Sequence, residues 1–298
     1  MVKKIKDRLG IQILFDFDNI FSACEFALDH QIKVLELNLN NIDFAHQIQN
    51  STMRQQIANY LRKYKITLLF HAAEGLSFFI PDRSTQNFII KSTIKLLQQA
   101  QEIGVKRVTF HLGTDMSFGV SAQKLRTFEV YPDFYYQFLY TALSTLKKNI
   151  PTKVILCVEN VGGFRYPFVL KMLPQFLGNR FGLTMDIGHI NRFSGPEKEQ
   201  ELKFFWDNYQ HIKNCHIHDN NGEWDQHNII GEGNINFQPY FELLVNTDTY
   251  FIFEVRPKES GLECIKRFDQ IIAPRLTKSN DLKNTIKQSS HHKQKVTK

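Results

Sequence analysis

Short apolar runs alternate along the chain with segments in which apolar residues recur every three or four positions. The first pattern is typical of buried parallel strands and the second of amphipathic helices. Strands are predicted over residues 11–17, 33–39, 66–72, 107–113, 153–160, 181–187, 212–218 and 250–256. Helices are predicted over residues 21–30, 50–64, 85–103, 134–149, 167–177, 197–210, 237–246 and 260–272. Eight strands, each followed by a helix, predict an α/β protein with a single (β/α)8 TIM barrel.

The distribution of charge separates a barrel from a tail. The chain has 298 residues and a net charge of +7, of which residues 275–298 carry +6 and residues 1–8 carry +3. The remaining body therefore carries −2. We predict a barrel over residues 1–274 and a basic, disordered tail over residues 275–298. A near-neutral body disfavours DNA binding, which needs cations along the binding face.

The cysteines and the N-terminus indicate the compartment. The four cysteines are far apart and form no CxxC pair: Cys24, Cys157, Cys215 and Cys264. They are predicted to be reduced, as in cytosolic proteins. The basic N-terminus precedes an apolar stretch that Asp16 and Asp18 interrupt, without a cleavage site for a signal peptide. No run approaches the length of a membrane span. We expect a cytoplasmic protein without membrane association.

Side chains that can bind metals end most of the later predicted strands. They are His71, His111, Glu159, Asp186, His216 and Glu254. The active site of a barrel lies at the carboxyl ends of its strands, so these residues are predicted to ring the mouth. An open doubly wound sheet also fits the alternation of elements, but convergence of ligands on one point favours the closed barrel. His189 in DIGH and Asp225 and His227 in DQH are predicted to face the same cavity from loops.

The nature of these nine donors indicates the metal. Imidazole and carboxylate ligands without thiolate suit Zn²⁺, Mn²⁺, Co²⁺ or Fe²⁺, and argue against a closed structural zinc site. A lone histidine at a strand end is more often a packing residue. Buried Glu159 and Glu254 are harder to explain that way, because an uncompensated carboxylate costs several kcal/mol. We therefore interpret the set as a metal site.

The same residues carry a resemblance to the xylose isomerase-like barrels of AP endonuclease family 2. The resemblance covers residues 20–270, and its closest likeness is to the sugar phosphate isomerase/epimerase-like group with its DIGH, HxxD and DxHxxxGEG pattern. The matching stretches include LELNLN, HAAEGLSFFIPD, VTFHLGT, CVENVGG, LTMDIGH, HIHDNNGEWDQHNIIGEGNINF and FIFEV.

The resemblance implies how the metals are divided. Its ketose epimerase branch implies one site made of Glu159, Asp186, His216 and Glu254. Its endonuclease IV branch implies two more zinc ions. One would be held by His71, His111 and Glu159, and the other by His189, Asp225 and His227. The expected cofactor is therefore a divalent ion, zinc or manganese, with one to three per chain.

Two departures from these branches bear on the reaction. The chain has Asn160-Val161-Gly162-Gly163 where the endonuclease branch has an AGQG-type sequence after its bridging glutamate. It also has Gly222-Glu223-Trp224-Asp225 where the epimerase branch places an arginine. The resemblance thus specifies fold and metal more closely than substrate.

The expected activity is a metal-dependent isomerase or epimerase of sugars or sugar phosphates that works through a metal-stabilised enediolate. Glu159 and Glu254 are the expected acid/base pair, and His189 would bind a substrate oxygen. Arg165 and Arg192 would hold an anionic group, and Trp224 would contact the sugar; each is also explained as an ordinary loop residue.

Two other functions fit the same residues. One is a zinc-dependent phosphodiesterase like endonuclease IV, acting on abasic-site DNA, and the other is a metal-stabilised barrel that only binds a ligand. The expected partner is a sugar-like small molecule, and nucleic acid is expected only under the endonuclease alternative. Self-association into a homo-oligomer stays open.

Overall fold

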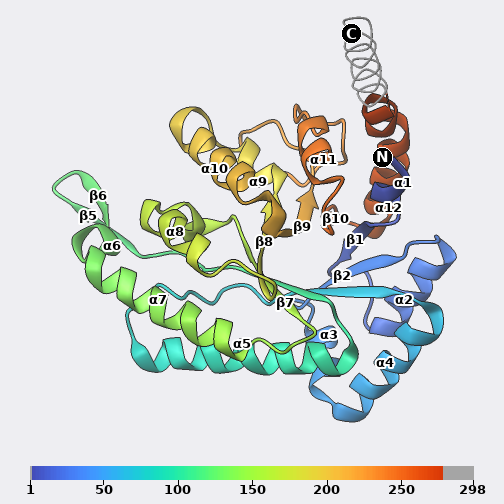
Figure 1. Cartoon of the computed structure of the whole chain (residues 1–298), viewed down its shortest axis with the longest axis horizontal. Helices are drawn as coiled ribbons and strands as arrows, with labels where there is room; N and C mark the ends of the chain where they lie inside the picture. The colour runs from blue at the N-terminus through green and yellow to red at the C-terminus, as the bar shows by residue number, and fades with distance from the viewer. Residues whose placement is uncertain (1, 278–298) are drawn as a thin grey trace, which may run out of the picture.

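The computed structural model describes residues 2–277, in which eight parallel strands close into a barrel (Figure 1). The strands are β1 (Leu9–Ile13), β2 (Val34–Asn38), β3 (Thr67–His71), β4 (Arg107–Phe110), β7 (Ile155–Glu159), β8 (Phe181–Asp186), β9 (Ile212–Ile217) and β10 (Tyr250–Phe253). Each pairs with its neighbour in chain order, and β1 pairs with β10 to close the ring. The predicted TIM barrel is confirmed.

Helices connect the strands and pack around the barrel. They are α1 (Val2–Lys6), α2 (Ile20–Asp29), α3 (Ile42–Gln49), α4 (Ser51–Tyr64), α5 (Arg83–Ile103), α6 (Thr127–Val130), α7 (Pro132–Asn149), α8 (Pro167–Met172), α9 (Ile187–Asn191), α10 (Gly195–Asp207), α11 (Gln238–Leu244) and α12 (Lys258–Arg267). Short 3-10 turns lie at Gly162–Arg165, Leu173–Gln175 and Tyr209–His211, and a π-helical turn at Phe268–Ile272 extends α12.

The first strand differs from its prediction. It spans Leu9–Ile13 rather than residues 11–17, and Phe15 beyond it is 75% exposed. The apolar run continues past the strand because Phe15 lines the cavity at the mouth of the barrel. Helix α3 was not predicted; Asn50 ends α3 and also caps α4, so two helices follow β2.

Polar side chains fill part of the barrel interior below the mouth. Glu36 on β2 accepts hydrogen bonds from Gln12 Nε2 at 3.0 Å and from Asn214 Nδ2 at 2.6 Å. Thr109 and Thr184 hydroxyls lie 2.8 Å apart in the same interior. All five are buried. Because each finds a partner, this polar layer forms a fixed floor under the mouth.

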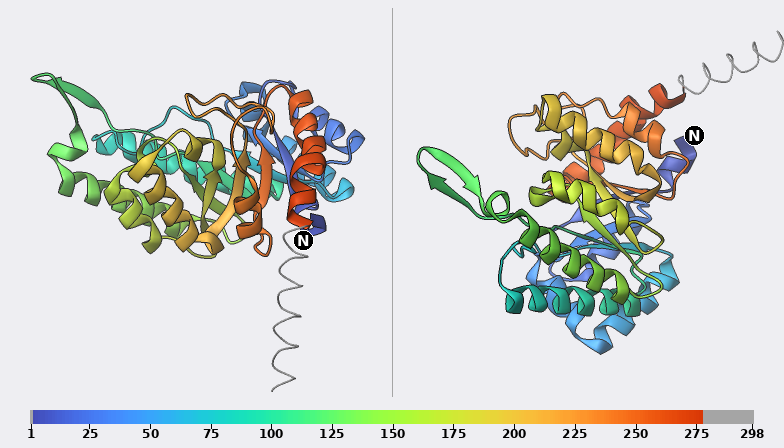
Figure 2. Two further views of the ribbon diagram at one scale, coloured as in Figure 1. Left: turned by 90° about the horizontal axis from the view of Figure 1, so that it is seen from above. Right: turned by 60° about the vertical axis from the view of Figure 1, so that its left-hand side comes forward.

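A β-hairpin between β4 and α7 was not predicted. Its strands, β5 (Ser117–Val120) and β6 (Gln123–Arg126), are antiparallel and project away from the barrel (Figure 2). Buried Asp115 fixes its base, since it accepts hydrogen bonds from the backbone of Met116 and Phe128, at 2.8 and 2.7 Å, and from the Thr127 hydroxyl. The hairpin is mostly exposed, so its sequence lacks the apolar run of the barrel strands.

Other expectations concern the cysteines, the membrane and the tail. All four cysteines are buried and free. No helix within residues 2–277 has both the length and the apolar character needed to span a bilayer. Residues 275–277 continue the last helix, with Leu276 buried. The rest of the predicted basic tail, residues 278–298, lies outside the described residues.

Candidate metal centre

The nine candidate ligands meet at the carboxyl ends of the barrel strands. His71, Glu159 and Asp186 are the last residues of β3, β7 and β8. His216 is next to last in β9, and His111 and Glu254 directly follow β4 and β10. A cavity of about 400 Å³ opens at this end, and its lining includes His111, Glu159, His189, Asp225, His227 and Glu254. The predicted convergence is therefore present.

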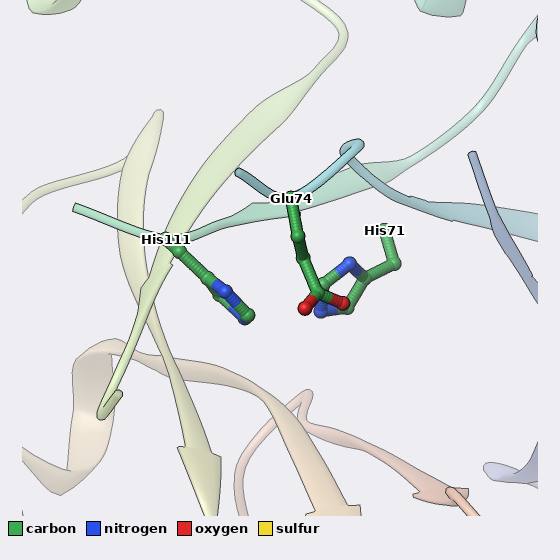
Figure 3. A group of neighbouring side chains, drawn as sticks. All are labelled: His71, Glu74 and His111. Carbon is green, nitrogen blue, oxygen red and sulfur yellow. The ribbon is translucent and has the colours of Figure 1, made fainter. Parts of the chain in front are cut away.

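The first group consists of His71, His111 and Glu159. Both imidazoles place Nε2 at 3.1 Å from the same atom, Glu159 Oε2. His71 Nδ1 lies 3.0 Å from the carbonyl oxygen of Ala72, which fixes the ring and leaves Nε2 for the centre. Figure 3 shows that the carboxylate of Glu74 also points toward these rings. Glu74 is a further oxygen donor for this group.

The four-ligand group consists of Glu159, Asp186, His216 and Glu254. Its ligand atoms all lie within 4.8 Å of one another, and all four residues are buried. His216 Nδ1 lies 2.8 Å from Glu254 Oε2, 3.3 Å from Glu159 Oε1 and 3.9 Å from Asp186 Oδ2. Glu159 turns one oxygen to this group and the other to the first group, so it joins them.

The third group consists of His189, Asp225 and His227. Asp225 Oδ2 lies 3.1 Å from His189 Nε2 and 3.2 Å from His227 Nε2. Asp186 caps α9 by accepting from the backbone N–H of His189 at 2.7 Å, so the first turn of α9 brings the His189 ring back over the centre. His227 lies in the loop with a left-handed φ of 49°. Its side chain nevertheless meets Asp225.

Buried Asp219 holds the loop that carries Asp225 and His227. It accepts from the backbone N–H of Gly231 at 2.8 Å and of Ile235 at 3.2 Å. A Cβ at Gly233 would lie 2.3 Å from Asp219 Oδ1, so this position has no space for a larger residue. The HxxD and GEG parts of the motif therefore shape the loop.

Several buried polar atoms of the centre lack a hydrogen bond among residues 2–277. They are Asp186 Oδ2, His189 Nδ1, Asp225 Oδ1, Glu254 Oε2 and both ring nitrogens of His218. Leaving a buried polar atom without a partner costs about 1–3 kcal/mol. All are nitrogen or carboxylate donors of the kind that zinc and manganese bind. The residues present thus fit a divalent cation.

The carboxylates that surround the histidines also change their pKa values. Burial alone would lower the pKa of His71, His189 and His227, but neighbouring carboxylates raise them to about 9, about 10 and about 9. Burial raises the pKa values of Glu159 and Glu254, but the neighbouring His216 lowers them. Both pKa values therefore lie well below the usual range for glutamate. Protons on imidazole thus offset the carboxylates, a role that a metal ion takes over when it binds.

Sequence comparison assigns the chain to a protein family. The model of the xylose isomerase-like TIM barrel family matches residues 21–268. The chain belongs to this family. An uncharacterized protein of Methanocaldococcus jannaschii, MJ1311, is 30% identical over 162 residues, which cover 48% of this chain and 54% of that protein. The chain therefore aligns with about half the length of this relative.

Several solved structures have a similar fold. A D-tagatose 3-epimerase-like protein has a TM-score of 0.70 at 19% identity, over 90% of this chain and 99% of the other. A zinc-bound IOLI protein has a TM-score of 0.65 at 15% identity, over 90% and 98%. Endonuclease IV from Thermus thermophilus has a TM-score of 0.61 at 15% identity, over 88% and 99%. At these identities the likeness shows the shared fold.

The three residues predicted to bind substrate, Arg165, Arg192 and Trp224, differ in their contacts and exposure. The Arg165 guanidinium donates to buried Glu201 at 2.7 Å, so its charge is already paired. The Arg192 side chain makes no hydrogen bond or ion pair within residues 2–277 and lines a second cavity of about 490 Å³. Val161 and His189 line both cavities, which therefore adjoin. Trp224 is 59% exposed and lines neither of them.

Four residues of the centre were not predicted. Glu36 contacts His216 from below, Glu74 faces the first group, His218 lies between Asp186 and Asp225, and Arg256 donates to Glu254 Oε1 at 3.0 Å. Glu74 follows His71 by the same three residues that separate Asp186 from His189. That spacing was the available signal for Glu74. Arg256 supplies part of the positive charge that buried Glu254 requires, so a metal ion is not its sole compensation.

Proposed function

We propose that the chain is a metal-dependent isomerase or epimerase of a small hydroxy-carbonyl carbohydrate. The four-ligand group supports this most directly, because it combines a compact cation site with two carboxylates at the edge of a cavity of about 400 Å³. A cavity of this size suits a small substrate. Leu14, Phe15 and Val161 supply apolar wall against which a sugar carbon skeleton would lie.

Glu159, Asp186, His216 and Glu254 would hold the cation. When bound, it would supply Lewis-acid stabilisation of the negative charge that develops on the substrate oxygens. Glu254 is the better placed of the two glutamates to move a carbon-bound proton. Arg256 binds its Oε1, and an imidazole contacts only its Oε2, which lies 2.8 Å from His216 Nδ1. Glu159 contacts imidazoles through both oxygens, so its role as the second acid/base residue requires one contact to open.

The surroundings of the cavity favour a phosphorylated substrate. Arg192 is a cation without a protein partner in residues 2–277, in the cavity that adjoins the centre at His189. Arg126 reaches the same cavity from the hairpin. Guanidinium groups bind phosphate oxygens through paired hydrogen bonds. His189, whose Nδ1 has no hydrogen bond in the described part of the chain, would contact a substrate oxygen between the cation and the phosphate.

Solvent deuterium exchange tests the proposal whichever isomer the reaction forms. The zinc- or manganese-loaded protein is incubated in D₂O with a panel of keto-sugars and their phosphates, and deuterium at carbon is measured by NMR. We expect exchange with at least one phosphorylated keto-sugar. Glu254→Gln should abolish exchange while Glu102→Gln, on exposed α5 surface, should not. Absence of exchange across the panel would contradict the proposal.

A second candidate is cleavage of abasic-site DNA. It is favoured by the first and third groups, which give the centre enough donors for three cations around Glu159. Two observations disfavour it. Residues 9–274 carry a net charge of −2, and among the described residues that line the cavity at the mouth, Arg256 is the one arginine or lysine. Three zinc ions per chain together with cleavage of an abasic-site duplex would establish this alternative over the first.

A further inference from the structure

His218 is a buried imidazole that belongs to none of the three groups. It follows His216 by two residues and is 0% exposed. Neither of its ring nitrogens makes a hydrogen bond within residues 2–277. An unpaired buried polar group costs about 1–3 kcal/mol, so a ring with two such atoms calls for a partner that the side chains do not supply.

Two carboxylates face His218 Nε2. Asp186 Oδ1 lies 3.2 Å away and Asp225 Oδ1 lies 3.4 Å away, and neither is aligned as a hydrogen bond. Bonds of about 2.0–2.2 Å to one tetrahedral zinc place neighbouring ligand atoms about 3.3–3.6 Å apart. Asp225 Oδ1 also lacks a hydrogen bond among the described residues. His218 Nε2 thus has, toward each of the two aspartate oxygens, the spacing of a ligand that shares a cation, and a ring nitrogen of His218 lies within 4.8 Å of ligand atoms of Asp186 and His189 on one side and of Asp225 and His227 on the other.

The ring of His218 is held in this position from two sides. His227 stacks on it with ring centroids 3.9 Å apart and an angle of 19° between the planes. On another side lies Gly188, where a Cβ would come within 2.0 Å of the ring carbon Cε1 and 2.2 Å of Nε2. Only glycine leaves room for the ring, so the structure around His218 directs it toward the two aspartates.

We propose that His218 is a metal ligand that extends the third group to Asp186. The cation would be of the zinc type, since its donors are imidazole nitrogen and carboxylate oxygen. Asp186 would then join the third group to the four-ligand group, as Glu159 joins the first group to it. The inference rests on the metal centre of the proposed function and is independent of the substrate.

Cobalt binding tests this assignment. The full chain is stripped with a chelator, dialysed and titrated with Co²⁺, whose visible absorption reports its ligands. His218→Gln keeps an N–H donor of similar reach but replaces imidazole with a poor ligand. We expect one class of site to lose at least about tenfold in affinity, with an altered spectrum. His46→Gln, an exposed imidazole on α3, is the matched control and should bind as the wild type does.

The outcomes separate this inference from the proposed function. Unchanged cobalt affinity and spectrum in His218→Gln would overturn the inference alone. A wild-type chain that binds no metal would overturn both. Gly188→Ala provides a second variant, because its methyl group should displace the His218 ring and reproduce the loss.

If neither variant folds, an experiment on the wild-type protein tests whether His218 binds the metal. In the cobalt-saturated chain, NMR of histidine-labelled protein counts the imidazoles whose ring N–H protons carry the large contact shifts that only a bond between nitrogen and cobalt produces. Histidines at the three groups are His71, His111, His189, His216 and His227. A sixth shifted ring supports the assignment of His218, whereas five shifted rings overturn it.

Discussion

His216 Nε2 lies 2.8 Å from Glu36 Oε1, on the side of the ring opposite its contacts with Glu159 and Glu254. Both His216 and Glu36 are fully buried. A carboxylate below the ring fixes which nitrogen carries the proton and leaves Nδ1 free to bind metal. Gln12 and Asn214 in turn hold Glu36, so the polar floor of the barrel orients a ligand at its mouth.

Glu36→Gln should therefore weaken metal binding without removing a ligand. We expect the four-ligand group to lose about 10–100-fold in zinc affinity, because the amide no longer favours the Nδ1-ligating form of His216. Zinc competition with a fluorescent chelator measures the loss. Asp115→Asn is a control with a buried carboxylate at the base of the hairpin, and its zinc affinity should stay within about twofold of wild type. Equal affinity in the two variants would refute the role of Glu36.

Glu159→Gln should affect two groups at once. Its two oxygens contact His71 and His111 on one side and His216 on the other. We expect reduced zinc content and a loss of activity of about 10²–10⁴-fold. His111→Gln removes a ligand from the first group alone, so the comparison shows whether the first group is needed for catalysis. Full activity in Glu159→Gln would rule out both proposed reactions.

Metal affinity should rise with pH. In the absence of metal the pKa values of His71, His189 and His227 are raised to about 9, about 10 and about 9, so each ring is protonated at neutral pH. A ring must lose its proton before it ligates, so binding releases protons and strengthens as pH increases toward about 10. Calorimetry in buffers of different ionisation enthalpy counts the protons released. A pH-independent affinity would contradict this prediction.

Arg192→Ala should discriminate between substrates. A charge-assisted hydrogen bond contributes about 1.5–3 kcal/mol, so KM for a phosphorylated sugar should rise about 10–150-fold. The unphosphorylated sugar should be unaffected, because it makes no use of this cation. Steady-state kinetics with both substrates measure the difference, and Arg62→Ala on exposed α4 surface is the control. A similar change for both substrates would exclude Arg192 from phosphate binding.

Gly10→Ala should destabilise the barrel. A Cβ at Gly10 on β1 would lie 2.5 Å from the backbone oxygen of Val34 and 2.9 Å from the Ile252 side chain, so neighbouring strands would have to separate. We expect a loss of about 1–3 kcal/mol in the free energy of unfolding. Denaturant titration measures it. Gly178→Ala, where a Cβ has no neighbour within 4 Å, should change stability much less.

The sequence allowed the barrel and its strand-end ligands to be predicted because both leave local patterns. Glu159 and Asp186 end apolar runs, so each appears as a polar residue where a buried strand stops. Glu36 lies in the middle of β2, and its orientation depends on a hydrogen bond from Asn214, which is 178 residues away in the sequence. The role of His218 depends on contacts with Asp186 at the end of β8 and with Asp225 in a separate loop. Such relationships exist only after folding, so periodicity could not indicate them.

The exposed hairpin was missed for a different reason. Its strands bury little apolar surface, and Asp115 and Thr127 at its base secure it through hydrogen bonds. Phe15 was misassigned to a strand because an exposed aromatic residue at a cavity has the same hydrophobicity as a buried one. The pattern of apolar residues therefore described the core well and the rim of the site poorly.

The order of the strands affects how the protein is made. During synthesis β1 emerges first, but its partner β10 is the last strand, and Glu254 follows β10 directly. A nascent chain that has not reached residue 250 leaves β1 and β9 with unpaired edges, which are prone to association with other chains. It also lacks a complete set of ligands for the four-ligand group. The full metal centre can therefore assemble only after the ribosome has produced nearly the whole barrel. Binding of the metal thus requires that β10 has been made and the barrel can close.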